Sequence, residues 1–165
     1  MENTVKFERF TELKKQALAL CREEGRPLPD PGQMNPIVLA LIGDSVFTFY
    51  VRLRLLTVSS HVQVIHTIAA RAVSAVLQAK AFLQLEETLS PQEAAVAHRG
   101  RNAKSMVPKS ATVHEYRAAT AFETLCGWLL LTDQEERLEA YMEQAFRIIV
   151  DAMGRSAEAG KRTER

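Results

Sequence analysis

The positions of glycine and proline constrain the fold of this chain more than any other sequence feature. Six of these helix-breaking residues fall between positions 25 and 36, which indicates a linker or an extended loop. From residue 37 to residue 90 the chain has no proline and a single glycine, Gly43. Long helices are therefore expected after the linker. Before it, apolar residues recur at helical spacing over residues 5–24, and this pattern predicts an N-terminal helix that Gly25 ends.

Helix-start signals predict where the later helices begin. Asn35 followed by Pro36 predicts a helix that runs to residue 56, and because this helix is apolar on nearly all sides it is expected to be central and buried. Residues 60–85 are predicted as helical, either continuous or broken in two. Capping boxes that begin at Ser90 and Thr112 predict a short helix and a helix that runs to residue 131.

The remaining segments complete an all-α prediction with one folded domain. Residues 100–109 are predicted as a polar, basic loop, and no segment alternates between apolar and polar residues as a strand would. Asp133 with Glu136 predicts the cap of a last helix over 134–153, which Gly154 is expected to end. Three regions follow from these signals: an N-terminal helix and linker over 1–34, a folded domain over 35–154, and a disordered tail over 155–165.

The charges are segregated along the chain although they nearly cancel in total. The 165 residues are 47% apolar and carry a net charge of +1, which fits one globular domain with one core. Residues 45–122, however, hold nine basic and four acidic residues, a balance of +5, together with all four histidines. A basic surface attracts polyanions, of which nucleic acid is the commonest. The alternative is a solvated basic face that binds nothing.

Several classes of protein are disfavoured by what the sequence lacks. No apolar run is expected to span a membrane, and the first residues do not resemble a secretory leader. Cys21 and Cys126 lie far apart, which disfavours a disulfide scaffold and a zinc site and suits a reducing cytosol. There is no phosphate-binding glycine loop, no nucleophile elbow and no His-Glu-x-x-His motif. We therefore expect a cytoplasmic protein with no membrane partner.

Two acidic residues stand alone within apolar helical segments. Asp44 lies in the middle of the most apolar predicted helix, and Glu123 lies in a second apolar run over residues 118–130. A buried carboxylate is costly to desolvate, so each acid needs a cationic partner, several hydrogen bonds or a divalent metal ion. Two carboxylates that share a site can bind Mg²⁺, which polarises a phosphodiester and activates water for hydrolysis.

Two interpretations of these acids remain open at this point. In the first, they form a metal site that faces the basic surface. In the second, Arg71 or Arg117 forms a structural ion pair with each of them. A glycine lies near each acid, Gly43 and Gly127 respectively, and this placement indicates either close backbone packing or the approach of a ligand.

The segments that carry the two acids resemble motifs of the ribonuclease III family. Residues 42–47, Ile-Gly-Asp-Ser-Val-Phe, are similar to the signature helix of the family, and residues 120–127, Thr-Ala-Phe-Glu-Thr-Leu-Cys-Gly, are similar to its second acidic motif. The chain also resembles the Mini-III subfamily, because its length leaves no room for a C-terminal double-stranded-RNA-binding domain. Further segments resemble the same subfamily: residues 70–75, 78–80, 99–105, 107–109 and 116–120. The resemblance extends over residues 36–153.

The resemblance implies a homodimeric, all-α endonuclease that cuts both strands of double-stranded RNA with Mg²⁺ bound to carboxylates. Asp44 and Glu123 match the metal-binding and catalytic acids of the family. The positions of two further family carboxylates hold Ala40 and Thr120 here, a reduced set that the Mini-III subfamily shares. Leu41 matches the residue that inserts into the partner subunit, the alternative being that Leu41 belongs to the core.

Contacts with RNA are expected to come from the basic region. A-form RNA is recognised mainly by its shape, phosphates and 2′-hydroxyls, so a loop of cationic and small polar residues suits it. The candidate RNA-binding residues are Arg99, Arg101, Asn102, Lys104, Ser105, Lys109 and Arg71. Supporting roles at the site are expected for Thr120, which could orient water, and for Ser74 and Gln78, whose spacing from Arg71 places all three on one helical face.

These features together predict a Mg²⁺-dependent endoribonuclease. The resemblance implies that it matures the ends of 23S (large-subunit) ribosomal RNA and leaves 5′-phosphate and 3′-hydroxyl ends. One alternative is a non-catalytic RNA-binding or ribosome-associated protein on the same fold, and another is a helical bundle whose acids form ion pairs. The motifs do not cover the N-terminal helix, which could pack on the core, extend the dimer or dock on a ribosomal protein.

Overall fold

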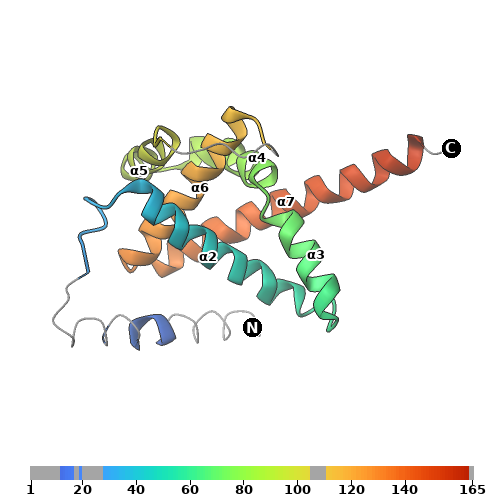
Figure 1. The fold of residues 1–165 in the computed structure, drawn as a ribbon, viewed down its shortest axis with the longest axis horizontal. Coiled ribbons are helices and arrows are strands. Elements are labelled where there is room, and N and C mark those ends of the chain that lie inside the picture. Colours follow the sequence, from blue (N-terminus) through green and yellow to red (C-terminus); the bar gives the residue numbers. More distant parts are fainter. Residues whose placement is uncertain (1–11, 17–18, 20–27, 105–110, 164–165) are drawn as a thin grey trace.

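The protein is built from helices throughout the part of the chain that the structure describes. A computed structural model describes residues 12–16, 19, 28–104 and 111–163. The all-α prediction is confirmed for these residues (Figure 1). The helices follow one another in the order α2 Pro36–Leu55, α3 Val62–Ala72, α4 Ala75–Leu85, the 3-10 turn η1 Glu86–Thr88, α5 Pro91–Arg101, α6 Val113–Leu131 and α7 Glu135–Thr163.

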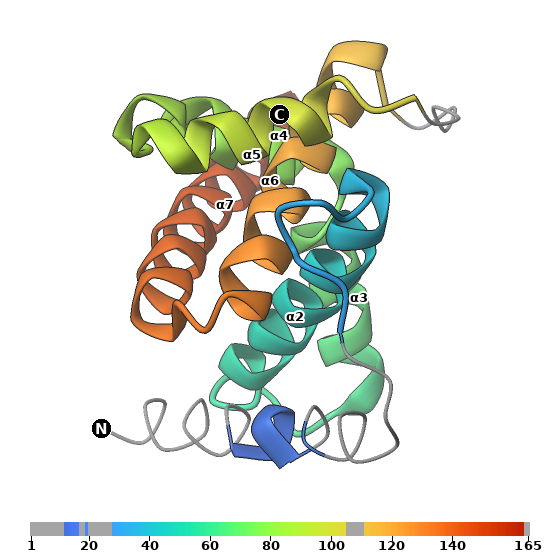
Figure 2. The same ribbon diagram turned by 90° about the vertical axis from the view of Figure 1, so that its left-hand side faces the viewer.

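The central element is α6, which packs against α2, α4 and α5 (Figure 2). Twelve of its nineteen residues are buried, whereas eight of the twenty residues of α2 are. The prediction that α2 would be the buried central helix is therefore wrong in part, because one face of α2 is covered by α6 and the opposite face carries exposed apolar side chains.

By length and apolar composition α2 would be long enough to cross a membrane, contrary to the expectation from the sequence. Core helices of globular proteins have the same properties. The inner face of α2 packs against α6, and Asp44 lies close to this contact. We therefore describe α2 as a core helix that is left uncovered on one side.

The helix starts predicted from capping signals are confirmed. The Asn35 side chain accepts a hydrogen bond from the amide of Ile37 at 2.9 Å. Ser90 and Thr112 each form a reciprocal capping box with the glutamate three residues later. The helical stretch predicted over 60–85 is broken in two, because α3 ends at Ala72 and α4 begins at Ala75.

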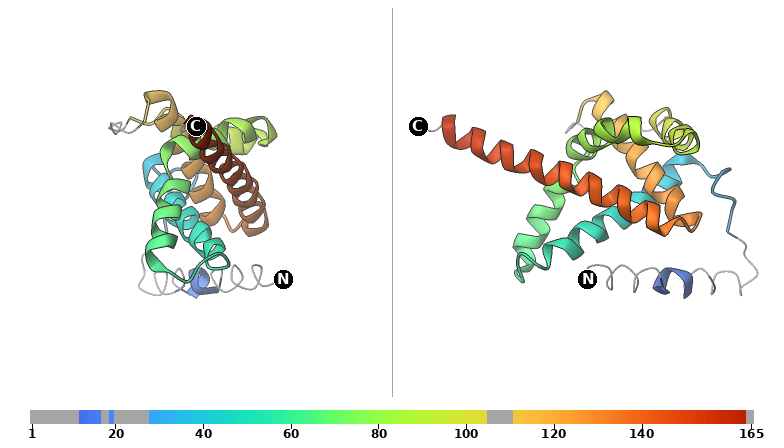
Figure 3. Two further views of the ribbon diagram at one scale, coloured as in Figure 1. Left: turned by 90° about the vertical axis from the view of Figure 1, so that its right-hand side faces the viewer. Right: turned by 180° about the vertical axis from the view of Figure 1, so that it is seen from behind.

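Three predicted boundaries differ from the structure. The loop expected from residue 100 begins later, because α5 continues to Arg101. Asp133 does not cap the last helix, because its backbone is left-handed, with φ of 56°, and its carboxylate faces Lys14. Gly154 does not end α7, which extends away from the body of the protein to Thr163 (Figure 3). A single glycine lowers helix stability by only about 1 kcal/mol, so helix-forming neighbours such as Ala152 and Arg155 carry the helix through it.

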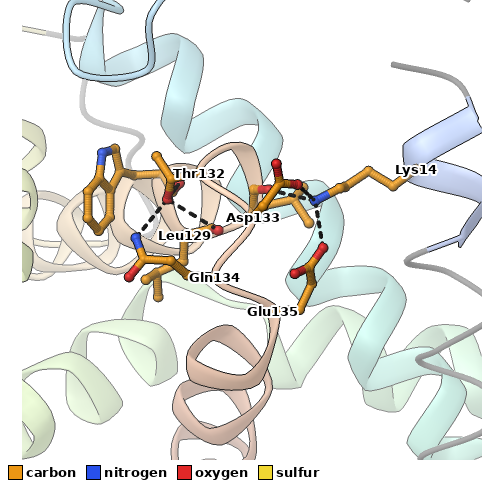
Figure 4. A network of polar contacts seen from close by, with 8 residues as sticks. Lys14, Leu129, Thr132, Asp133, Gln134 and Glu135 are labelled. Atoms are coloured by element: carbon orange, nitrogen blue, oxygen red, sulfur yellow. Dashed lines mark hydrogen bonds and ion pairs between the residues drawn. The ribbon is translucent and has the colours of Figure 1, made fainter. Parts of the chain in front are cut away.

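An N-terminal segment docks on the turn between α6 and α7 through Lys14 (Figure 4). Residues 12–16 are helical, as predicted, and the greater part of the helix predicted over 5–24 lies outside the described residues. The Lys14 ammonium donates hydrogen bonds to the carbonyl oxygen of Leu130 at 2.8 Å, to Asp133 at 3.0 Å and to Glu135 at 3.2 Å. Since the Lys14 side chain is only 7% exposed, this contact fixes the segment against the folded domain.

An aromatic cluster joins α2, α6 and α7 directly beside Glu123. The rings of Phe47 and Phe122 meet edge to face with centroids 4.9 Å apart, and the rings of Phe122 and Tyr141 lie 5.3 Å apart. All three side chains are fully buried. The residue that precedes Glu123 is therefore anchored in the core, which limits how far Glu123 itself can move.

Candidate active site

Two glycines bring the backbones of α2 and α6 into direct contact. A Cβ atom on Gly43 would overlap the backbone carbonyl oxygen of Glu123, and a Cβ atom on Gly127 would overlap that of Leu39. No other residue type fits either position without separating the helices. The interpretation that these glycines allow close backbone packing is confirmed, and the crossing places Asp44 next to Glu123.

The two carboxylates are partly withdrawn from water, and neither has a cationic partner among the described residues. Each is partly buried, and none of the ion pairs formed within the described residues includes Asp44 or Glu123. Arg71 and Arg117, the proposed partners in the ion-pair alternative, are both exposed. That alternative is therefore wrong, because the two arginines remain in solvent while the acids lie at the helix crossing.

Burial and mutual repulsion make the acids reluctant to ionise together. Burial, with repulsion by Asp44 as a second cause, raises the pKa of Glu123 to about 8. Burial also raises the pKa of Asp44. Two like charges in one poorly solvated site retain a proton between them near neutral pH, unless a cation neutralises them. Such a pair is a strong candidate for a functional site.

Two polar side chains lie beside the carboxylates. Gln78 on α4 lies close enough to Asp44 and Glu123 to lower the pKa of each, although its amide forms no hydrogen bond of good geometry. The Thr48 hydroxyl, one turn after Asp44 on α2, also lowers the pKa of Asp44. Sequence reasoning missed Thr48, although a polar residue four positions after an acid on an apolar helix was a signal that could have found it.

The candidate supporting residues have different surroundings from those expected. Arg71 lies in the last turn of α3, whereas Gln78 lies within α4, so the helical face predicted to hold both does not exist. Ser74 sits at the N-cap of α4, and its side chain does not cap the helix. The Thr120 hydroxyl is buried and donates a hydrogen bond to the carbonyl oxygen of Tyr116 at 2.9 Å.

Comparisons with known proteins identify the family of this fold and site. Residues 37–134 match the model of the Ribonuclease III domain. The chain is 43% identical over 122 residues to a Mini-ribonuclease 3 of Brevibacillus brevis, a match that covers 73% of this chain and 91% of the relative. A Mini-ribonuclease 3 of Symbiobacterium thermophilum is 42% identical over 121 residues, which cover 72% of this chain and 92% of the relative. The chain belongs to the ribonuclease III family.

A solved structure supports the same fold. A protein from Fusobacterium nucleatum superposes with a TM-score of 0.64 at 23% identity, and the match covers 67% of this chain and 92% of that one. This likeness bears on the fold alone, whereas the curated relatives and the matching domain model identify the chain as an endoribonuclease of the ribonuclease III family, in its Mini-ribonuclease 3 group.

The chain's residues fit the metal ion on which enzymes of the ribonuclease III family generally depend. Within the described ranges there is no group of three or more His, Cys, Asp and Glu side chains that could hold a metal ion. The donors at the helix crossing are instead two carboxylates and the amide of Gln78, whose buried oxygen and nitrogen lack partners. Oxygen donors of this kind suit a hard divalent cation such as Mg²⁺.

Two of the candidate RNA-binding residues of this ribonuclease III domain make structural contacts. The Arg99 guanidinium donates hydrogen bonds to the carbonyl oxygens of Gly32 and Met34, each at 2.6 Å, and so holds the segment before α2. Arg101 donates to Glu86 at 3.0 Å. Both guanidinium groups are therefore engaged within the chain, and RNA binding by Arg99 and Arg101 stays a prediction.

The other candidates for RNA contact are exposed or lie outside the described residues. Asn102 is exposed at the end of α5, with its amide against the His98 ring. Lys104 and Arg71 are exposed and have no partner among the residues that the structure describes. Ser105 and Lys109 fall in residues 105–110, outside that part.

Proposed function

We propose that this endoribonuclease cleaves double-stranded RNA with Mg²⁺ held by Asp44 and Glu123. The observation that carries the proposal is a pair of partly buried carboxylates that have no cationic partner among the described residues. Burial and the neighbouring Asp44 raise the pKa of Glu123 to about 8. A bound divalent cation would offset the repulsion between the two acids.

The residues of the chain hold the reacting groups in place. Asp44 and Glu123 are fixed by the contact of α2 with α6, and the core ring of Phe122 limits the movement of Glu123. When bound, Mg²⁺ supplies a Lewis acid that polarises the phosphodiester and activates water for attack. The low polarity around the acids strengthens every charge interaction there, so small shifts of either carboxylate are expected to lower the rate.

The exposed cationic side chains of the basic region favour double-stranded RNA as the substrate. Lys104, Arg71 and Arg117 are exposed and unpaired among the described residues, and they belong to the region with a balance of +5. Exposed cations of this kind contact phosphates without reading bases. Following the resemblance, we propose precursors of 23S ribosomal RNA as the substrate, with 5′-phosphate and 3′-hydroxyl ends as products and a ribosomal protein as a further candidate partner.

A homodimer is part of the proposal. Leu41 on α2 is 65% exposed, and Val38, three residues earlier on the same face of the helix, is 48% exposed. The interpretation of Leu41 as a core residue is therefore wrong, and an uncovered apolar face supports an interface. The cytoplasm is the proposed location, and the free, buried Cys126 fits a reducing compartment.

The decisive experiment compares the chain with its Asp44→Asn variant on a long RNA duplex. Asparagine keeps the shape of Asp44 and removes its charge, so the variant is expected to fold normally and to lose cleavage by at least about 100-fold. The assay follows the duplex on a gel with Mg²⁺ and then with EDTA. A matched control is Asp151→Asn, on the exposed part of α7. Full cleavage by the Asp44 variant, or in EDTA, would contradict the proposal.

The non-catalytic alternative is motivated by Ala40 and Thr120, which replace two carboxylates of the family pattern. The naming of the curated relatives as ribonucleases argues against it. The same assay separates the two functions, because a binding protein would retard the duplex on a gel and leave it uncut with Mg²⁺.

A further inference from the structure

Gln78 is a buried amide whose polar atoms form no hydrogen bond of good geometry with the described residues. Its side chain is 0% exposed, and neither the nitrogen nor the oxygen of the amide forms a hydrogen bond within the described residues. Burying an amide without hydrogen bonds destabilises a protein, and a native structure rarely retains one unless it has another use.

The position of Gln78 suggests what that use is. Gln78 lies on α4, which packs against α6, and its amide lies beside the Asp44 carboxylate of α2 and the Glu123 carboxylate of α6. Three helices therefore bring one neutral amide and two acids to the same point. The amide carries two N–H donors and one carbonyl acceptor, so it can donate to each of two carboxylates and still present an oxygen.

We propose that Gln78 completes the divalent-cation site when a cation binds: its amide nitrogen then donates to the Asp44 and Glu123 carboxylates and orients them, and its carbonyl oxygen is the third protein oxygen that faces the cation. This inference rests on the proposed function, since it requires a cation between the two acids. Amide oxygens are suitable ligands for hard cations, and they add no further negative charge to a site where two acids already repel each other.

A Gln78 ligand also accounts for the smaller number of carboxylates at this site than in the wider family pattern. The positions that hold carboxylates in the wider family pattern are Ala40 and Thr120 here, and both are buried. The Thr120 hydroxyl donates its hydrogen to Tyr116, so its proton is already used within α6. Gln78 is the one buried polar side chain among the described residues that lies beside both acids and has no partner.

The test measures cation binding directly on the full chain, with Mn²⁺ as the probe because it prefers the same ligands as Mg²⁺ and can be followed by its spin resonance. The variants are Gln78→Met, which keeps the unbranched shape without polar atoms, and Gln78→Leu. The matched control is Gln84→Met, an exposed glutamine on the same helix. Mn²⁺ affinity is expected to fall about 10- to 100-fold in both Gln78 variants and to stay unchanged in the control.

Thermal unfolding in EDTA provides a second readout that a purely structural role would not produce. Removing an unpartnered buried amide should leave the unfolding temperature of the cation-free protein unchanged or raise it. Wild-type Mn²⁺ affinity in both Gln78 variants would overturn the proposal, as would a lower unfolding temperature in EDTA together with unchanged affinity.

Failure of the proposed function gives a different result. If Asp44→Asn binds Mn²⁺ as the wild type does, or the wild type binds none, the cation is not held by the acid pair, and the inference about Gln78 falls with it. If Asp44→Asn abolishes binding while Gln78→Met leaves it intact, the inference about Gln78 fails and the proposed function stands.

Discussion

At the scale of single residues, the acid pair destabilises the fold that contains it. Asp44 and Glu123 lose solvation at the helix crossing, and within the described residues they gain no ion pair in return. Functional sites commonly retain such unfavourable groups because the charge is needed for binding or chemistry. The destabilisation caused by these two acids should therefore be measurable in the free energy of unfolding of the cation-free protein.

We predict that stability in EDTA falls as the pH rises from about 4.5 to about 8, because the folded pKa of Glu123 is about 8 and its ordinary value is 4.5. In that interval the folded state keeps a proton that the unfolded state has released. Unfolding is therefore increasingly favoured as the pH rises, by on the order of 3 kcal/mol over the interval. Asp44, whose pKa is also raised, acts in the same direction.

The measurement is urea unfolding at pH 5 and pH 8 for the wild type and for Glu123→Gln. The variant cannot release this proton, so its stability should decline less over the same interval. Identical declines in the two proteins would show that Glu123 titrates normally in the folded state.

At the scale of elements, the contact between α2 and α6 is what builds the site. Gly43 and Gly127 let the two backbones touch, and each glycine lies on the same stretch of helix as an acid. The helices meet only because no side chain separates them at either point. A methyl group at one of these glycines should therefore disturb both the core and the site.

We predict that Gly43→Ala lowers the free energy of unfolding by at least about 2 kcal/mol, because its Cβ would overlap the carbonyl oxygen of Glu123 in a rigid backbone. The matched control is Gly154→Ala on α7, where no atom lies within 4 Å of the added Cβ. That change should raise stability by about 0.5–1 kcal/mol through helix propensity. Urea unfolding measures both, and equal effects in the two variants would contradict the close contact.

At the scale of the whole molecule, the uncovered face of α2 is the feature that most needs a partner. Val38 and Leu41 are exposed on the helix that carries Asp44. A second copy of the chain could cover this face and would then lie near the site. We therefore propose this face of α2 as the interface of the homodimer.

We predict that Leu41→Arg converts the proposed homodimer into a monomer, because a charged side chain would be buried in the apolar interface. Light scattering coupled to size-exclusion chromatography measures the mass. Leu83→Arg is the control, since Leu83 on α4 is also exposed, at 42%, but lies on a different helix. A dimer that survives Leu41→Arg, or a wild type that is monomeric, would refute the interface.

Local signals explain which parts of the structure could be predicted from the sequence. The helix starts at Ser90 and Thr112 depend on hydrogen bonds between residues three positions apart, so the pattern alone was sufficient. The predictions of a helix cap at Asp133 and of a helix end at Gly154 were wrong because other residues decided both. A carboxylate that binds Lys14, 119 residues away in sequence, is not free to cap a helix, and a glycine ends a helix only when its neighbours also favour ending it.

The roles of the basic residues depended on distant parts of the chain. Arg99 reaches carbonyl oxygens 65 and 67 residues earlier, and Arg101 reaches Glu86, 15 residues earlier. Sequence spacing cannot distinguish such engaged arginines from Arg71, which is exposed and has no partner in the described part of the chain. This is why the positive charge of the region was predictable, whereas the cations available to RNA were not.

The sequence by itself determined the helices and the two acids, because capping, breaker positions and an isolated charge in an apolar run are local properties. Only the tertiary structure decided that α2, α4 and α6 bring their polar side chains together, that the acids have no cationic partner among the described residues, and that the Gln78 amide lies beside both of them. The physical reason is that the desolvation of a charge and the satisfaction of a buried amide depend on atoms brought together from distant parts of the chain.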